Sequence, residues 1–248
     1  MTYFDEISNA QKKAFLEAHT FFSNAQTEQH FVKAIPQISS LQCWLEYFVM
    51  TDRFRESVAG FFSEAVNDAI LSYMFARVGT WRPALQSLRS ALENTLFFLY
   101  YKDHQIELSL WANQKHRIGF SELCQYFRSH PNLVGLDHQS ETGVGQLEIA
   151  YSKLSKAVHG SVESFRMVAK SPADQLPAVH VHSPVELSRY VSILKDVVEP
   201  LNLLLMGIFK ESLQGTSLPA LRQGIAGSLA PTRRTIAKKK FKVVLQKA

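Results

Sequence analysis

The run from Tyr151 to Gly160 carries the residues best suited to chemistry in this chain. It places His159 at the end of a helical pattern, with the hydroxyl of Ser155 one turn earlier and that of Tyr151 two turns earlier. Residues four apart on an α-helix lie about 40° apart around the axis, so Ser155 and His159 share a face and Tyr151 lies about 80° from the histidine. A neutral imidazole in that setting can act as a general base or acid near pH 7.

Two lysines in the same run, Lys153 and Lys156, can supply a positive charge for a phosphate group. The sequence therefore predicts a catalytic group made of His159, Lys153, Ser155 and Tyr151. The structural alternative is that His159 caps a helix or forms a hydrogen bond with a neighbouring helix. Composition alone favours that alternative.

A second polar pair, Arg89 and Glu93, lies four residues apart in a leucine-rich helical stretch. Charged groups in an apolar helix need compensating partners, because burying an unpaired charge is costly. The pair is interpreted either as a structural ion pair, which the sequence favours, or as a polar patch that anchors a ligand or orients His159.

The remaining histidines and cysteines do not form a metal-ligand pattern. His180 and His182 alternate with valines as on a strand, but no cysteine or carboxylate cluster accompanies them. Cys43 and Cys124 lie far apart, each within a helical pattern, and are predicted to be buried thiols. We expect no metal site and no cofactor.

The positive charge is concentrated at the end of the chain. Residues 231 to 248 contain seven basic residues and no acid, whereas the whole chain carries a net charge of only +5. A basic arm of this kind attracts phosphate groups or an acidic protein. The predicted nucleic-acid-binding residues are Arg233, Arg234, Lys238, Lys239, Lys240 and Lys242. The alternatives are an acidic protein partner or a disordered tail that aids solubility.

Apolar residues recur at helical spacing along most of the chain, which predicts an all-α, multi-helix bundle of six to eight helices. Residues 1–230 are predicted to form one helical domain, followed by the basic tail. The predicted helices cover residues 54–78, about 80–101, 105–127 with an interruption near Gly119, 146–169, 184–214 with a kink at Pro200, and 218–229. Short strands are expected only at 178–182 and 241–245.

No apolar run is long enough to cross a membrane, and the N-terminus lacks a signal-peptide core, so a cytoplasmic protein is expected.

Three short motifs carry a family resemblance. They are Gly-x-Trp-Arg-Pro-Ala-Leu at residues 79–85, Leu-Arg-x-x-Leu-Glu at 88–93 and Tyr-x-x-Leu-Ser-x-x-Val-His-Gly at 151–160. Together they resemble the HEPN-like helical proteins, and more narrowly the bacterial members near the abortive-infection proteins. The resemblance covers a core of about residues 55–210.

This resemblance implies a metal-independent ribonuclease in phage defence or a toxin–antitoxin system, with two chains meeting as a homodimer. The family motif has an arginine and then, four to six positions later, a histidine on the same helix. His159 matches the histidine, but Lys153 stands where the arginine is expected and apolar Leu154 follows it. In the catalytic interpretation, His159 deprotonates a 2′-hydroxyl, the oxygen attacks the adjacent phosphate, and Lys153 or Lys156 stabilises the charge that develops.

The alternative is a non-catalytic helical subunit that docks a partner enzyme or nucleic acid through its helical surface and basic tail. Lysine is a weaker substitute for arginine at a bidentate phosphate contact, which favours the second interpretation.

Overall fold

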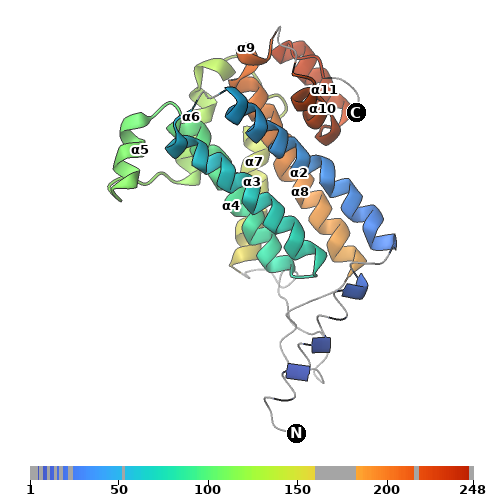
Figure 1. Ribbon diagram of the computed structural model, residues 1–248. Helices are drawn as coiled ribbons and strands as arrows, with labels where there is room; N and C mark the ends of the chain where they lie inside the picture. Colours follow the sequence, from blue (N-terminus) through green and yellow to red (C-terminus); the bar gives the residue numbers. More distant parts are fainter. Residues whose placement is uncertain are drawn as a thin grey trace.

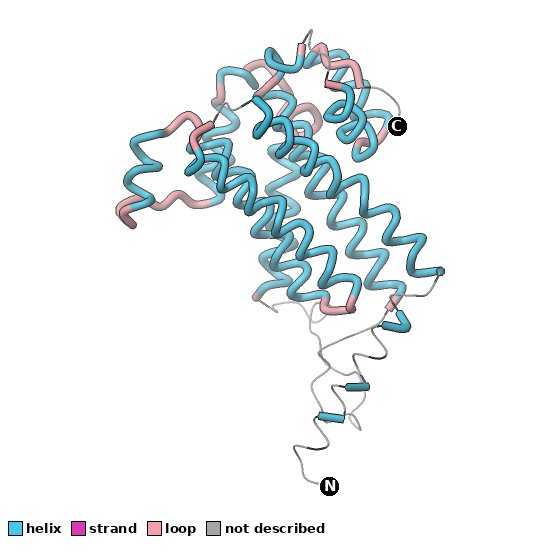
Figure 2. The backbone as a smooth tube through the Cα atoms, in the orientation of Figure 1, coloured by secondary structure: helices cyan, strands magenta, loops and turns pink. Residues whose placement is uncertain are grey.

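The computed structural model describes residues 25–51, 54–159, 183–214 and 218–245. It also describes nine positions nearer the N-terminus, namely Asp5, Ser8, Asn9, Lys12, Lys13, Leu16, His19, Thr20 and Phe21. Every regular element in these ranges is helical, and none of the described residues forms a strand. The predicted all-α fold is confirmed (Figure 2).

Five long helices form the body of the molecule (Figure 1). They are α2 (Ala25–Thr51), α3 (Glu56–Arg77), α4 (Trp81–Tyr101), α7 (Val144–Val158) and α8 (Pro184–Ile208). Helix α4 packs against α3, α7 and α8, while α2 lies against both α3 and α8. The apolar character of α4 follows from this central position, since three of its sides face other helices.

Shorter elements extend this body, so the described helices outnumber the predicted six to eight. They are α5 (Gln105–Ala112), α6 (Phe120–Ser129), the 3₁₀ turn η1 (Pro131–Leu133), α9 (Lys210–Leu213), α10 (Pro219–Ser228), α11 (Pro231–Ile236) and the π-helical turn η3 (Ala237–Phe241). The interruption expected near Gly119 is confirmed, but it is a full connector over residues 113–119. The predicted helix at 184–214 is α8 followed by the separate α9, and Pro200 lies inside α8.

The boundary between α3 and α4 lies where the sequence predicts it. Gly79 adopts φ 74°, a left-handed conformation that glycine reaches without strain. Thr80 is the N-cap residue of α4, but its hydroxyl donates back to the carbonyl of Phe75 at 2.8 Å rather than accepting a hydrogen bond from an α4 amide. The hydrogen bond from Thr80 to Phe75 of α3 therefore holds this turn in place.

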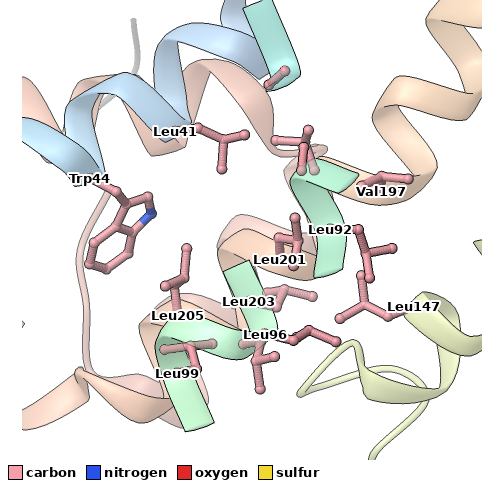
Figure 3. Close-up of a cluster of buried hydrophobic side chains, with 14 of the residues drawn as sticks. Leu41, Trp44, Leu92, Leu96, Leu99, Leu147, Val197, Leu201, Leu203 and Leu205 are labelled. Atoms are coloured by element: carbon pink, nitrogen blue, oxygen red, sulfur yellow. The ribbon is translucent and has the colours of Figure 1, made fainter. Parts of the chain in front are cut away.

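The hydrophobic core lies where α2, α4, α7 and α8 meet (Figure 3). Leucines of α4 and α8 occupy its centre, and Trp44 of α2 lies at one side with its ring stacked on Phe48 at 5.6 Å. Most α8 residues from Val197 onward are fully buried, which explains why this helix is apolar all round over its second half.

A buried polar network ties three helices together inside this core. The Asn202 side chain of α8 accepts a hydrogen bond from Trp44 Nε1 at 2.8 Å and donates to the Ser40 hydroxyl at 2.8 Å. It also donates to the Ser228 hydroxyl of α10 at 2.9 Å. Because both groups of the Asn202 amide have partners, the network fixes the relative positions of α2, α8 and α10 without leaving that amide unsatisfied.

Two expectations about the C-terminus are wrong. Residues 241–245 do not form a strand, because η3 ends at Phe241 and Lys242 turns the chain with φ 60°. Residues 231–245 are also not a free tail, since Phe241 and Val243 are both 0% exposed in the core. The other expected strand, at 178–182, lies outside the described residues together with His180 and His182.

Candidate functional site

Arg89, Glu93 and Tyr151 form a closed hydrogen-bonded group between α4 and α7. Arg89 Nη2 donates to the Tyr151 hydroxyl at 2.6 Å, and that hydroxyl donates to Glu93 Oε1 at 2.9 Å. The Arg89 guanidinium also contacts Glu93 Oε1 directly, at 3.2 Å from Nη2. The spacing of Arg89 and Glu93 predicted their pairing correctly. The sequence did not predict that Tyr151 bonds to both.

An aromatic stack covers this group on the side of α6. Phe120, the first residue of α6, lies parallel to the Tyr151 ring with centroids 3.7 Å apart. The Arg89 guanidinium lies 4.7 Å from the centroid of the same ring. No pattern in the sequence marked Phe120, since its contact with Tyr151 depends on the path of the 113–119 connector.

The surroundings hold the Tyr151 hydroxyl in its protonated form. Burial raises its pKa above the ordinary tyrosine value, and the hydrogen bond to Glu93 and that carboxylate's charge raise it further. The nearby Arg89 guanidinium opposes this shift. A protonated hydroxyl that already bonds to Glu93 serves to hold α4 and α7 together rather than to act as a base.

The other predicted catalytic residues do not gather around one point. His159 follows α7 as its C-cap residue and is exposed. Ser155, one turn earlier, has a hydroxyl oxygen that is buried and has no hydrogen-bond partner among the described residues. Lys153 forms an exposed ion pair with Asp196 of α8, with Nζ 3.1 Å from the carboxylate. Lys153 and His159 are six positions apart, which places them about 120° apart around the α7 axis.

One cation near His159 was not predicted from the sequence. Arg82, in the first turn of α4, donates from Nη2 to the carbonyl oxygen of Val158 at the end of α7. A positive charge at a helix C-terminus is stabilised by the helix dipole. The signal available was the Gly-x-Trp-Arg-Pro motif itself, since Arg82 and His159 belong to two of the short motifs quoted above.

The basic C-terminal element, residues 231–245, is the second candidate site. Three of its cations are engaged with the protein: Arg233 donates to the Ser140 carbonyl, Arg234 to the Leu229 carbonyl, and Lys240 pairs with Glu141 at 2.7 Å. That bond to Lys240 lowers the pKa of the Glu141 carboxyl. The three remaining lysines of η3 and its exit, Lys238, Lys239 and Lys242, are exposed.

Buried residues of the same element fix these lysines in place. The Phe241 ring packs against Gly207 of α8, where an added Cβ would lie 3.5 Å from the ring. Gln214 donates to the Phe241 carbonyl at 3.0 Å, and the Val243 amide donates to the Ala237 carbonyl at 3.1 Å. The lysines therefore project from a folded stretch of backbone.

Neither site holds a cluster suited to a metal ion. Among the residues that the structure describes, no three histidines, cysteines or carboxylates lie close enough together to ligate a metal. Within the same residues, no helix is long and apolar enough to cross a membrane.

The Arg89–Glu93–Tyr151 group is expected to contribute measurably to stability. Tyr151→Phe removes one hydroxyl that serves both charged partners, so the free energy of unfolding should fall by about 1–2 kcal/mol, a value kept low because the charged partners are partly exposed. Urea denaturation measures this change. Tyr101→Phe is the matched control, because its hydroxyl is buried without a hydrogen-bond partner among the described residues, and it should cost nothing. Equal effects of the two variants would refute the bonding role of Tyr151.

Comparison with known proteins does not assign a family or a function to this chain. The sequence matches no family model, and the searches of curated proteins and of solved structures found no similar protein. The HEPN-like resemblance thus rests on the three short motifs alone.

Proposed function

We propose that this protein is a HEPN-like helical subunit of a bacterial phage-defence or toxin–antitoxin system that binds nucleic acid in the cytoplasm without cleaving it. The basic C-terminal element provides the binding surface. The single observation that carries this proposal is the placement of Lys238, Lys239 and Lys242, which are exposed while Phe241 and Val243 beside them are fully buried.

Because their backbone is folded, these lysines are better phosphate ligands than lysines on a free tail. A disordered arm loses conformational freedom when it binds, and this cost weakens association. Here the backbone of residues 237–243 is already fixed by the core, so only side chains need to be ordered. Neutralising phosphates with lysines also releases counterions, which makes binding depend on salt.

The arrangement of α7 supports binding rather than cleavage. Lys153, the residue in place of the family arginine, faces Asp196 of α8 and lies away from His159. The Tyr151 hydroxyl is occupied by Arg89 and Glu93. Within one chain, Lys153 is therefore not placed to stabilise the charge that develops beside His159.

Removing the three exposed lysines tests the proposal. The variant Lys238→Gln, Lys239→Gln, Lys242→Gln should lose roughly tenfold or more in affinity for RNA at low salt, and the dependence of log K on log salt should flatten by up to about 2. The measurement is fluorescence anisotropy of a labelled RNA, titrated at several salt concentrations.

A matched triple variant controls for the change in net charge. Lys12, Lys13 and Lys33 are exposed lysines near the start of the chain, and changing all three to glutamine should leave the affinity and the salt slope nearly unchanged. If the two triple variants lose affinity equally, binding depends on total charge and the proposed surface is wrong.

Ribonuclease activity is the second candidate function, and the exposure of His159 favours it. An exposed imidazole at a helix end can reach a 2′-hydroxyl. Arg82, which bonds to the neighbouring Val158 carbonyl, or a second copy of the chain in a homodimer can supply a cation. In this alternative His159 takes the 2′ proton, the 2′-oxygen attacks the phosphorus, the bond to the 5′-oxygen breaks, and water protonates the departing 5′-oxygen. His159→Ala would then abolish cleavage while leaving RNA binding in place.

A further inference from the structure

The connector that follows α5 builds a cleft of about 310 Å³ at one edge of the molecule. Its lining consists of Trp111, Ala112, Gln114, His116 and Arg117. Figure 1 shows α5 at the left edge, projecting from the body and on the opposite side from α10 and α11. The cleft is therefore separate from the basic C-terminal element.

Trp111 presents a fixed aromatic surface in this cleft. The indole packs on one side against Phe61 of α3, with centroids 4.8 Å apart, and lies 6.1 Å from the Tyr101 ring of α4. Its side chain nevertheless remains 44% exposed. A ring held by the core and still open to solvent is the platform on which unpaired bases stack in proteins that bind single strands.

The backbone turns sharply to place basic residues beside this indole. Gln114 adopts φ 59°, and the Lys115 amide donates to the Leu110 carbonyl at 2.8 Å, closing the end of α5. This left-handed position usually belongs to glycine, so a glutamine there is held under strain by the surrounding turn. After this turn, His116 and Arg117 line the cleft, and the exposed Lys115 precedes them in the chain.

The polar groups of the cleft suit an anion. No acidic residue is among the five that line it, and Lys115 and Arg117 are both exposed. His116 Nε2 is buried and has no hydrogen-bond partner among the described residues. A guanidinium binds phosphate oxygens through two parallel hydrogen bonds, which fixes the phosphate relative to a neighbouring base.

We propose that this cleft binds single-stranded nucleic acid, with one unpaired base stacked on Trp111 and the adjoining phosphate held by Arg117. This inference rests on the proposed function and extends it by naming an unpaired strand as the ligand. A duplex is excluded from the site because its bases are already stacked on one another. The surface at η3 contacts phosphates only, so the two sites together select a strand with an exposed base.

Intrinsic fluorescence gives a direct test, because the chain has 3 tryptophans and two are buried. Trp44 is 0% and Trp81 is 7% exposed, so only Trp111 is open to contact with a base. Adding short oligouridylate or oligothymidylate to the full-length protein should quench the emission to saturation. The same titration with an RNA duplex or with inorganic phosphate should not, and Trp111→Phe should remove the quenching.

Variants separate stacking from a structural role. Trp111→Leu and Arg117→Gln should each weaken binding of the single strand by roughly tenfold. Arg117 is exposed, so its replacement leaves the packing of Phe61 and Tyr101 intact and the test holds even if Trp111→Leu loosens α5. Arg189→Gln, the same charge change near the start of α8, should have no effect.

Failure of this inference and failure of the proposed function give different results. If labelled RNA binds and the lysine triple variant weakens it, but the Trp111 emission does not change, the cleft is not a binding site and the basic surface stands. If Trp111 is quenched while the lysine triple variant binds normally, the cleft stands and the proposed surface fails. Unchanged affinity in Arg117→Gln, or equal quenching by duplex and single strand, would overturn the inference.

Discussion

Replacing Phe241 by alanine is expected to lower the free energy of unfolding by about 3–5 kcal/mol, the usual cost of deleting a fully buried aromatic ring. The ring is 0% exposed and packs against Gly207 of α8, so its removal leaves a cavity in the core. Urea denaturation followed by far-ultraviolet circular dichroism measures the loss.

The same substitution is expected to weaken nucleic-acid binding although it changes no charge. Without Phe241, the backbone that carries Lys238, Lys239 and Lys242 loses its main anchor, and binding must then order it. Val244→Ala is the control, because Val244 belongs to the same element but is 55% exposed. If Phe241→Ala destabilises the protein but binds RNA as tightly as the wild type, the folded backbone of residues 237–243 has no part in binding.

The second large effect is expected at Asn202. Asn202→Ala leaves Trp44 Nε1 buried without an acceptor and opens a small cavity between α2, α8 and α10, so the free energy of unfolding should fall by about 2–4 kcal/mol. Asn67→Ala, at an exposed position of α3, is the matched control and should change stability little.

Ser40→Ala separates the parts of this network. The Ser40 hydroxyl accepts one of the two hydrogen bonds that Asn202 donates, while Ser228 accepts the other. Its loss should cost about 1 kcal/mol, less than the loss of Asn202. An effect as large as that of Asn202→Ala would mean that the asparagine does not organise the network.

Periodicity and glycine were sufficient to predict the main helices. The helix predicted over residues 54–78 is α3 at Glu56–Arg77, and the break at Gly79 is present with the left-handed geometry that it requires. These features depend on neighbours within one or two turns. The end of α8 depends on contacts between helices, which explains why the helix predicted at 184–214 continued through the separate helix α9. The predicted continuation of α7 over residues 160–169 lies outside the described residues.

The C-terminal element shows what local pattern cannot reveal. Phe241, Val243 and Leu245 alternate as on a strand, yet Phe241 ends a π-helical turn and Lys242 reverses the chain with φ 60°. Alternation arises here because a sharp turn sends Phe241 and Val243 into the same core. Only the available space beside Gly207 of α8 explains this burial, and that space is a tertiary feature.

The candidate site was predicted in part. The pairing of Arg89 with Glu93 follows from their four-residue spacing, whereas the bond from Arg89 to Tyr151 joins residues 62 positions apart in the chain. Helical geometry alone separates Lys153 from His159 by about 120°, so this mismatch was available from the sequence. The exposed face of Trp111 was not, because it depends on the course of the connector after α5.

The most direct test of the central claim asks whether RNA that binds the protein stays intact. Wild-type protein and the His159→Ala variant are incubated with labelled tRNA, with and without EDTA. Each sample is then divided between a native gel, which detects binding, and a denaturing gel, which detects cleavage. If the protein binds RNA without cleaving it, both proteins should give a shifted band with full-length RNA. RNA that is cleaved by the wild type, resists cleavage by His159→Ala and does not depend on EDTA would contradict it and establish the ribonuclease instead.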